Sequence, residues 1–298
     1  MSHSKRYLRI TALVIICLVG QGCGVKLVYN NADRLARWWV SDYIDMNKVQ
    51  REYFNASTAD LMHWHRTTQL AIYRDELLGL ANTVESRSID SAQLEQIVAE
   101  VETWGFAITA RAVPIGVDVL LSLTPKQLRA FDRALLKSNR DYEREAERDP
   151  NDIAKEEAKN YAKLLRRFVG RLSADQKALI LNHHLEMAPD AQVILDYRRE
   201  WQRKLQGGLR SQPPDAELLA DLMLNFDKHY TPEFARMVEV NEAIYEDLTL
   251  ELLASLKDAQ RAKLVSELRE YAEIFDELIA EARSVPPSQP TSLPRSLE

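Results

Sequence analysis

A short element that recurs along the chain, and that is typical of helix starts, constrains the fold most strongly. In each copy glutamine follows an aliphatic residue four positions later, at residues 89–93, 123–127, 172–176 and 256–260. In the first three copies Asp, Thr or Ser stands directly after the aliphatic residue. Its side chain can cap free backbone N–H groups while the glutamine returns the bond. Because each copy precedes apolar residues at helical spacing, the sequence predicts a chain built of helices.

The fourth copy has Lys257 at the cap position, so Ser255 or Asp258 is expected to cap that helix instead. The copies stand 34, 49 and 84 residues apart, which argues against the fixed period of a solenoid. The sequence also lacks alternating strands bounded by Asn-Gly or Asp-Gly turns. We therefore expect an all-α fold, a multi-helix bundle of long antiparallel helices, either as one unit or as two helical subdomains.

Glycine and proline mark the expected limits of the helices. Residues 45–86 contain no proline and a single glycine, which predicts one very long helix or two joined near residues 55–58. Further starts are expected at four prolines: Pro150, Pro189, Pro214 and Pro232. The pair Gly207-Gly208, followed by Pro213-Pro214, predicts a break that divides the helical part into residues 23–206 and 207–284. Four prolines within residues 285–298 predict a disordered tail.

Residues 1–22 have the pattern of a signal peptide. Three basic residues without an acid precede a short apolar run at residues 10–19. The run is shorter than the roughly 20 residues that cross a bilayer, so a permanent transmembrane anchor is the weaker alternative. The segment resembles the lipobox of bacterial lipoproteins, in which a small residue such as Gly22 precedes the acylated cysteine. That resemblance makes Cys23 the expected lipid attachment site.

The cysteine content agrees with an acylated Cys23. Of the two cysteines, Cys17 lies in the apolar run and would leave with the leader. A single free thiol is a liability in an oxidising compartment, and acylation removes it. The alternative is an ordinary secretory signal followed by a chance cysteine. Gly24 follows Cys23, and the lipoprotein resemblance then implies residence at the outer membrane, facing the periplasm.

The net charge bears on the partners that the chain can have. The leader holds three of the 39 basic residues and none of the 45 acidic ones, so the remainder carries a net charge of −9. Nucleic acid is therefore not expected as a partner, because that affinity depends on neutralised phosphates. Anionic lipid headgroups repel such a chain as well. Attachment to the membrane should depend on the acyl chains at Cys23.

An aromatic segment follows the cysteine. From a helix start at Asn30 or Asn31, the side chains of Leu35, Trp38, Trp39 and Tyr43 are expected on one broad face. Two tryptophans this close to a lipid anchor suggest a docking patch for the membrane interface or for a partner protein. The alternative, which we favour, is that they form part of the core with one ring left at the surface.

Two resemblances add expectations. Residues 27–31 (Leu-Val-Tyr-Asn-Asn), with Trp38, Trp39 and Tyr43, resemble an uncharacterised family of Gram-negative lipoproteins of unknown function, which implies an all-helical periplasmic domain. The element at 123–127 resembles the Leu-Thr-x-x-Gln motif of small periplasmic helical chaperones, which implies a partner-binding role for Thr124 and Gln127. Plain helix capping is the favoured reading of that element.

The sequence contains no motif of a known catalytic or cofactor site. It lacks a nucleophile elbow, a P-loop, a zinc-protease motif and a dinucleotide fingerprint. Its histidine pairs, His63 with His65 and His183 with His184, are spaced poorly for metal chelation on a helix. We therefore expect no metal, no cofactor and no enzymatic activity. The expected function is that of a lipid-anchored interaction module with an envelope protein as its partner. The alternatives are a chaperone-like binder of unfolded envelope proteins and, third, an enzyme with an unrecognised site.

Overall fold

The computed structural model describes residues 23–187, 191–282 and 293, and these residues form helices without a strand. This confirms the all-α, multi-helix prediction. The expected signal peptide at residues 1–22, the proline start at Pro189 and all of the expected tail except Leu293 lie outside the described residues.

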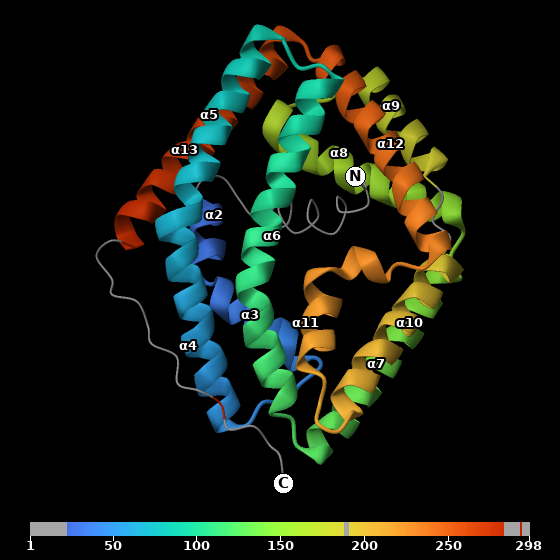
Figure 1. The fold of residues 1–298 in the computed structure, drawn as a ribbon. Coiled ribbons are helices and arrows are strands. Elements are labelled where there is room, and N and C mark those ends of the chain that lie inside the picture. The colour runs from blue at the N-terminus through green and yellow to red at the C-terminus, as the bar shows by residue number, and fades with distance from the viewer. Residues whose placement is uncertain (1–22, 188–190, 283–292, 294–298) are drawn as a thin grey trace.

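The helices form antiparallel pairs around the rim of an open frame, and one long helix crosses its middle (Figure 1). α13 lies along α5, α8 pairs with α9, and α7 pairs with α10, while α6 runs across between them. The helices in chain order are α2 (Cys23–Asn30), α3 (Ala32–Ser41), α4 (Lys48–Trp64), η2 (His65–Gln69), α5 (Leu70–Ser86), α6 (Ser91–Leu121), α7 (Pro125–Ala146), α8 (Pro150–Val169), α9 (Ala174–Glu186), α10 (Ala191–Arg210), α11 (Ala216–Leu224), η3 (Phe226–His229), α12 (Pro232–Ser255) and α13 (Asp258–Ala282).

The longest helical run is continuous through α4, η2 and α5. It corresponds to the predicted long helix, but the irregular part is a π-helical segment at η2 and not a joint at residues 55–58. Thr67 and Thr68 donate hydroxyl bonds of 2.9 and 2.7 Å to the carbonyls of His63 and Trp64 in the preceding turn. These bonds satisfy backbone oxygens where the regular ladder is disturbed.

The apolar side chains gather in connected clusters. The largest cluster joins α4, α6, α7, α10 and α11, the second lies where α2 and α5 meet α13, and the third joins α8, α9 and α12. Phe168 packs against the second and third clusters, and Leu77 joins the second to a small fourth one. The core is therefore shared along the frame.

The predicted internal break is displaced in the structure. Gly207 and Gly208 lie inside α10, and the chain turns afterwards, at residues 211–215. A Cβ atom on Gly208 would approach the side chains of Leu218 and Leu219 to 3.3 Å, so glycine is needed for α11 to pack closely on α10. Leu205 before the turn and Leu219 after it belong to the same cluster. The glycine pair thus marks a close helix contact, and the division at residue 207 falls within a helix.

Proline opens helices at two of the expected places. Pro150 and Pro232 are the first residues of α8 and α12, and Asp149 and Thr231 cap them. Pro214 does not open α11. That helix begins two residues later, and Asp215 caps it by accepting a 2.9 Å bond from the Leu218 N–H.

The recurring element forms helix starts as predicted. Asp90 with Gln93, and Ser173 with Gln176, make complete capping boxes. At α7 the Thr124 N–H donates to Gln127 Oε1 over 3.0 Å, and the Gln127 N–H donates to Thr124 Oγ1 over 3.3 Å.

The fourth helix start differs from the expectation in one respect. The Lys257 N–H donates to Gln260 Oε1 over 3.1 Å, so the glutamine half of the box persists without a capping side chain at Lys257. Ser255 does not replace it, because its hydroxyl donates to the Leu252 carbonyl and accepts from Gln176.

A fifth element at residues 46–50 was missed by the sequence analysis. Asn47 and Gln50 make a complete capping box at the start of α4, with bonds of 2.9 and 3.0 Å. Met46 holds the position of the aliphatic residue and is buried. Met46 is not an aliphatic residue, so this copy departs from the pattern of the other four. The thioether side chain of methionine nevertheless packs in a core equally well.

Four of these five glutamines meet in two pairs, which we call the glutamine clasps. In the first clasp Gln127 Nε2 donates to Gln50 Oε1 over 2.7 Å and to the Asp45 carbonyl over 2.7 Å. Gln50 Nε2 donates in turn to the carbonyl of Ser122 over 2.9 Å. Each glutamine thus caps its own helix and binds the chain that leads into the other.

The second clasp repeats this arrangement between α9 and α13. Gln176 and Gln260 donate to each other, both over 3.0 Å. Gln176 Nε2 also donates to the Ser255 carbonyl over 3.2 Å, and Gln260 Nε2 to that of Arg171 over 3.0 Å. In both clasps each glutamine donates to a backbone carbonyl in the element of its partner glutamine. That carbonyl belongs to the residue just before the apolar residue with which the partner's element begins. The two clasps are therefore equivalent local structures with approximate two-fold symmetry.

The clasps predict an unequal effect of glutamine substitutions. Gln176 is 2% exposed, and Gln176→Ala would leave the Gln260 amide and the Ser255 carbonyl without their buried partner. We expect a loss of about 2–4 kcal/mol in the free energy of unfolding. Gln93→Ala is the matched control, because Gln93 caps α6 but meets no second glutamine among the described residues; it should cost about 1 kcal/mol. Urea unfolding measures both, and equal losses would show that the amide pair contributes nothing.

Candidate functional site

The part of the chain nearest the predicted lipid site is the arm, which we define as α2 and α3. Cys23 is the first described residue and the first residue of α2. Figure 1 shows the arm beside α4, with α2 toward α5 and α13. The sequence predicted functional residues here and at the start of α7. The structure connects these two places, because the clasp residue Gln127 binds the carbonyl of Asp45, four residues after the arm ends.

α2 is fastened to the body by Tyr29. This side chain is 5% exposed and packs with Leu70, Tyr73 and Leu278 in the second core cluster. Its hydroxyl makes a short hydrogen bond with Nδ1 of His65, in the π-helical segment η2. The Arg66 guanidinium lies 5.1 Å from the centre of the Tyr29 ring. Tyr29 therefore holds the arm where the long helix is irregular.

Polar contacts on either side of Tyr29 fix α2 further. Arg66 donates to the side chain of Asn30 over 2.7 Å. Lys26 forms ion pairs with Glu277 at 2.9 Å and with Glu281 at 2.6 Å, both on α13. Tyr29 and Asn30 belong to the segment that carries the family resemblance. Its physical role is thus to dock α2 onto η2 and α13.

The pair of Tyr29 and His65 is electrically neutral at pH 7. Burial, and to a smaller extent the charge of Arg66, lowers the pKa of His65 to about 4. Burial also raises the pKa of the Tyr29 hydroxyl well above its usual range. The hydroxyl therefore keeps its proton and the imidazole is uncharged, so the bond joins two neutral groups. The Tyr73 ring packs edge-on against His65, with centroids 5.4 Å apart.

The inner face of α3 contacts the body through small or partly buried side chains. Ala36, Val40 and Tyr43 pack against the first core cluster. The Tyr43 hydroxyl lies 3.4 Å from Ser138 Oγ on α7. Arg37 donates to Asn55 on α4 over 2.8 Å. These contacts fix the rotation of α3 about its axis.

The outer face of α3 carries the two tryptophans. Trp38 is 68% exposed, Trp39 is 62% exposed, and Leu35 beside them is half exposed. The favoured expectation that the tryptophans form part of the core is therefore wrong. α3 has apolar residues on two faces, and the smaller pair of Ala36 and Val40 faces the first core cluster. The Trp39 ring keeps one contact, with Tyr43 at 5.7 Å between centroids.

A shallow depression of about 550 Å³ adjoins Trp38 and contains three arginines; we call it the arginine hollow. Arg34 and Arg37 come from α3, and Arg51 comes from α4. Arg51 donates to the Met46 carbonyl over 2.8 Å. The acidic residue that lines the hollow is Asp45. Guanidinium groups beside an exposed indole suit a surface that meets anionic groups.

The other predicted partner-binding residues are positioned differently. Thr124 is exposed at the start of α7, while Gln127 is partly buried in the first clasp. Leu123 of the same motif is buried in the first core cluster. Two of the three defining residues of the Leu-Thr-x-x-Gln motif are thus engaged inside the protein.

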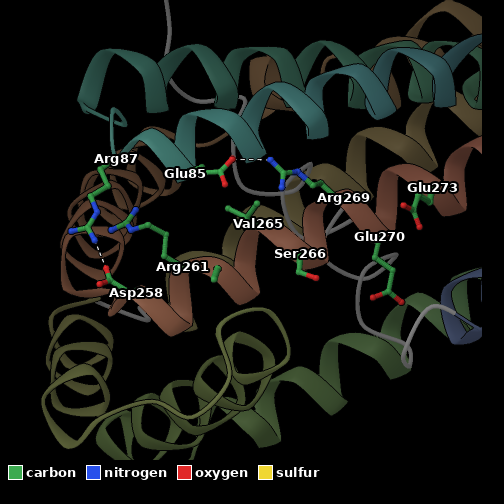
Figure 2. Close-up of a pocket in the computed structure, with 10 residues that line it drawn as sticks. Glu85, Arg87, Asp258, Arg261, Val265, Ser266, Arg269, Glu270 and Glu273 are labelled. Carbon is green, nitrogen blue, oxygen red and sulfur yellow. Dashed lines mark hydrogen bonds and ion pairs between the residues drawn. The ribbon is translucent and has the colours of Figure 1, made fainter.

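Another depression lies between α5 and α13 and has a volume of about 840 Å³ (Figure 2). Two ion pairs cross it: Arg87 binds Asp258, and Arg269 binds Glu85 at 2.8 Å. Arg261 donates to the carbonyls of Val84 and Leu253. These groups fasten α13 to α5.

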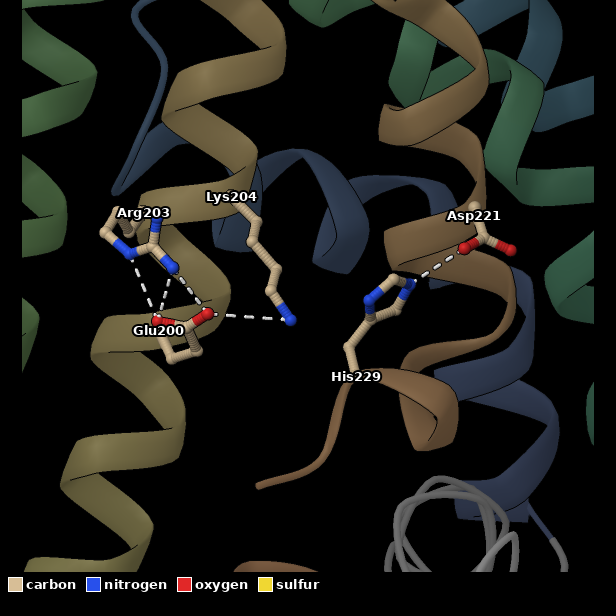
Figure 3. Close-up of polar contacts among 5 residues, drawn as sticks. All are labelled: Glu200, Arg203, Lys204, Asp221 and His229. Atoms are coloured by element: carbon tan, nitrogen blue, oxygen red, sulfur yellow. Dashed lines mark hydrogen bonds and ion pairs between the residues drawn. The ribbon is translucent and has the colours of Figure 1, made fainter. Parts of the chain in front are cut away.

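Other polar pairs lie within α10 and between η3 and α11. On α10, Glu200 binds Arg203 at 2.6 Å and Lys204 at 3.6 Å (Figure 3). His229 of η3 binds Asp221 of α11 at 2.8 Å, a contact that closes the turn between them. Within the described residues no group of three or more His, Cys, Asp or Glu side chains is arranged to hold a metal ion.

Comparison with family models gives one match. The model described as a family of unknown function (DUF6279) matches residues 42–236, which is more than half of the chain. Neither the curated proteins nor the solved structures contain a match. The matched region begins just after α3 and includes both halves of the first clasp.

The buried histidine predicts a pH dependence of stability. An unfolded histidine titrates near 6.5 and His65 near 4, so the unfolded chain binds more protons between these values. Stability from this group is complete above pH 6.5 and falls as the pH drops toward 4. We expect about 2 kcal/mol of loss between pH 7 and pH 5. His65→Gln can still accept from Tyr29 but does not titrate, so urea unfolding of this variant should lose less over the same interval. Equal losses in the two proteins would contradict the assignment.

Proposed function

The chain belongs to DUF6279, a family of unknown function, and we propose, from the lipobox-like residues that end at Cys23, that it is a lipid-anchored protein of the cell envelope, acylated at Cys23. Its helical body would serve as a non-enzymatic interaction module for another envelope protein. The residue after the cysteine is Gly24, and by the lipoprotein resemblance this residue implies the outer membrane, facing the periplasm, as the location.

One observation supports an anchoring role: no linker separates Cys23 from the body. Tyr29, six residues after Cys23 and on the same helix, is buried. At the rise of an α-helix this separation is only about 9 Å along the axis. A flexible linker lets an anchored domain move away from the membrane. Here acyl chains on Cys23 would hold the body directly at the lipid surface.

The site of acylation can be tested with a fatty-acid analogue that is detected after metabolic labelling. The wild-type protein should take up label, and Cys23→Ser should take up none and leave the membrane fraction or keep its leader. Cys17→Ser is the matched control, because Cys17 is the other cysteine and belongs to the leader; this variant should be labelled like the wild type. A wild-type protein without label would remove the lipoprotein proposal.

A second candidate function is chaperone-like binding of unfolded envelope proteins, and α6 provides an observation in its favour. By length and composition α6 could span a membrane, and 22% of its most apolar window is buried. Its buried residues, including Val117 and Leu120, lie in its last third, while Phe106 is 39% exposed. An apolar helix with this much accessible surface could hold an unfolded chain.

This second function predicts that α6, and not the helix-start motif, carries the activity. Phe106→Ser should reduce suppression of client aggregation, measured at a temperature at which the variant stays folded. Leu136→Ser, on α7, also removes an exposed apolar side chain and should leave suppression unchanged. If the motif at α7 recognises clients instead, Gln127→Ala should abolish suppression even at a temperature at which this variant, weakened in the first clasp, is still folded. Wild-type protein that suppresses no aggregation would exclude chaperone activity.

A further inference from the structure

We propose that the outer face of α3 lies in the membrane interface, with the rings of Trp38 and Trp39 among the lipid headgroups and the arginine hollow facing the phosphates. This inference rests on the proposed acylation of Cys23. It adds a second point of membrane contact and therefore an orientation of the body on the bilayer.

The exposure of the two rings is the first observation. The chain has five tryptophans, and the other three are Trp64, Trp104 and Trp201, which are at least partly buried. Trp104 packs against Tyr73 at 4.5 Å, Arg111 covers Trp64, and Trp201 donates to the Leu222 carbonyl. Trp38 and Trp39 thus leave large amphipathic rings in water, a placement that favours the headgroup region of a bilayer.

The distance from the anchor is the second observation. Trp38 is 15 residues beyond Cys23, which at helical rise is at most about 22 Å. If the arm stood upright on the membrane, the rings would lie far above the headgroups. If it lies along the surface, the rings stay near the headgroups, and Leu27 and Leu35 add exposed apolar side chains to the arm. The arm can lie flat because Tyr29 and Val40 hold it against the body on its other side.

Charge is the third observation. The chain beyond the leader has a net charge of −9, which repels anionic lipids. Residues 23–45 contain three basic and three acidic residues and are therefore neutral. The arginine hollow concentrates guanidinium groups beside Trp38, and such groups attract anionic headgroups. The face of α3 is thus the part of the described surface near Cys23 on which lipid contact meets least repulsion.

A protein partner on the same face fits the observations less well. Two tryptophans supply roughly 500 Å² at most, since an aromatic side chain buries about 150–250 Å². A stable protein interface buries about 800 Å² on each partner. A bilayer needs no such area, because the acyl chains on Cys23 already keep the protein at the surface.

The inference can be tested by fluorescence quenching with the complete acylated protein. The protein is reconstituted into vesicles of phosphatidylethanolamine and phosphatidylglycerol that contain phosphatidylcholine brominated on its acyl chains. Bromine quenches tryptophans that reach the interface. We expect strong quenching for the wild type and loss of most of it when Trp38→Phe and Trp39→Phe are combined. Trp64→Phe is the matched control and should retain the wild-type quenching.

The outcomes separate this inference from the proposed anchor. Protein that floats with the vesicles but shows equal emission with and without bromine is anchored by its lipid while α3 stays in water, which overturns the inference alone. A face that docks on an envelope protein gives the same result, because these vesicles contain lipid only. Protein that carries no acyl group and does not float overturns the anchor and, with it, the orientation.

Discussion

The structure depends on the way in which four glutamine amides, three of them buried, are satisfied by other groups of the protein. A buried amide without hydrogen-bond partners costs free energy. In each clasp the partners are a second glutamine and carbonyls close to a helix start. The oxygen of each amide also closes its own helix cap. A single side chain therefore links the start of its helix to the end of another. The clasps thus join the start of α4 to that of α7, and the start of α9 to that of α13.

The first clasp also determines how the arm leaves the body. Gln127 binds the carbonyl of Asp45, and the buried Ile44 and Met46 on either side of it pack in the first core cluster. At the other end of the arm Tyr29 is fixed by His65. With both ends held, α3 cannot rotate to bury its tryptophans without breaking one of these contacts. The exposure of Trp38 and Trp39 is thus a property of a rigid segment.

Sequence periodicity and capping residues predicted the helices well because those signals are local. They fixed the all-α class, the caps at Asp90, Thr124 and Ser173, and the starts at Pro150 and Pro232. Pairing between copies of the element is a long-range property. The five residues of one copy do not indicate which other glutamine its own glutamine will contact.

The misplaced features have the same origin. α3 has apolar residues on two faces, so its composition cannot tell which face is covered. In the sequence, Gly207 and Gly208 predict a break between helices. In the structure Gly208 lies inside α10, at the point where α11 comes close. The π-helical segment contains His65, whose buried partner, Tyr29, lies 36 residues earlier. In each case the deciding contact comes from another helix, and the local sequence is compatible with either outcome.

Electrostatics then limits how an acylated form of this chain can sit on a membrane. An acidic body repels an anionic surface only over a Debye length, about 8–10 Å at physiological salt. Because Cys23 is joined to the body without a linker, the neighbouring surface lies within that range. The neutral arm with its arginine hollow is the part of that surface that can approach the lipid at little cost, so the acidic helices would face away from the bilayer. The docking of α2 by Tyr29 and Lys26 thus converts a point attachment at Cys23 into a defined orientation of the whole body.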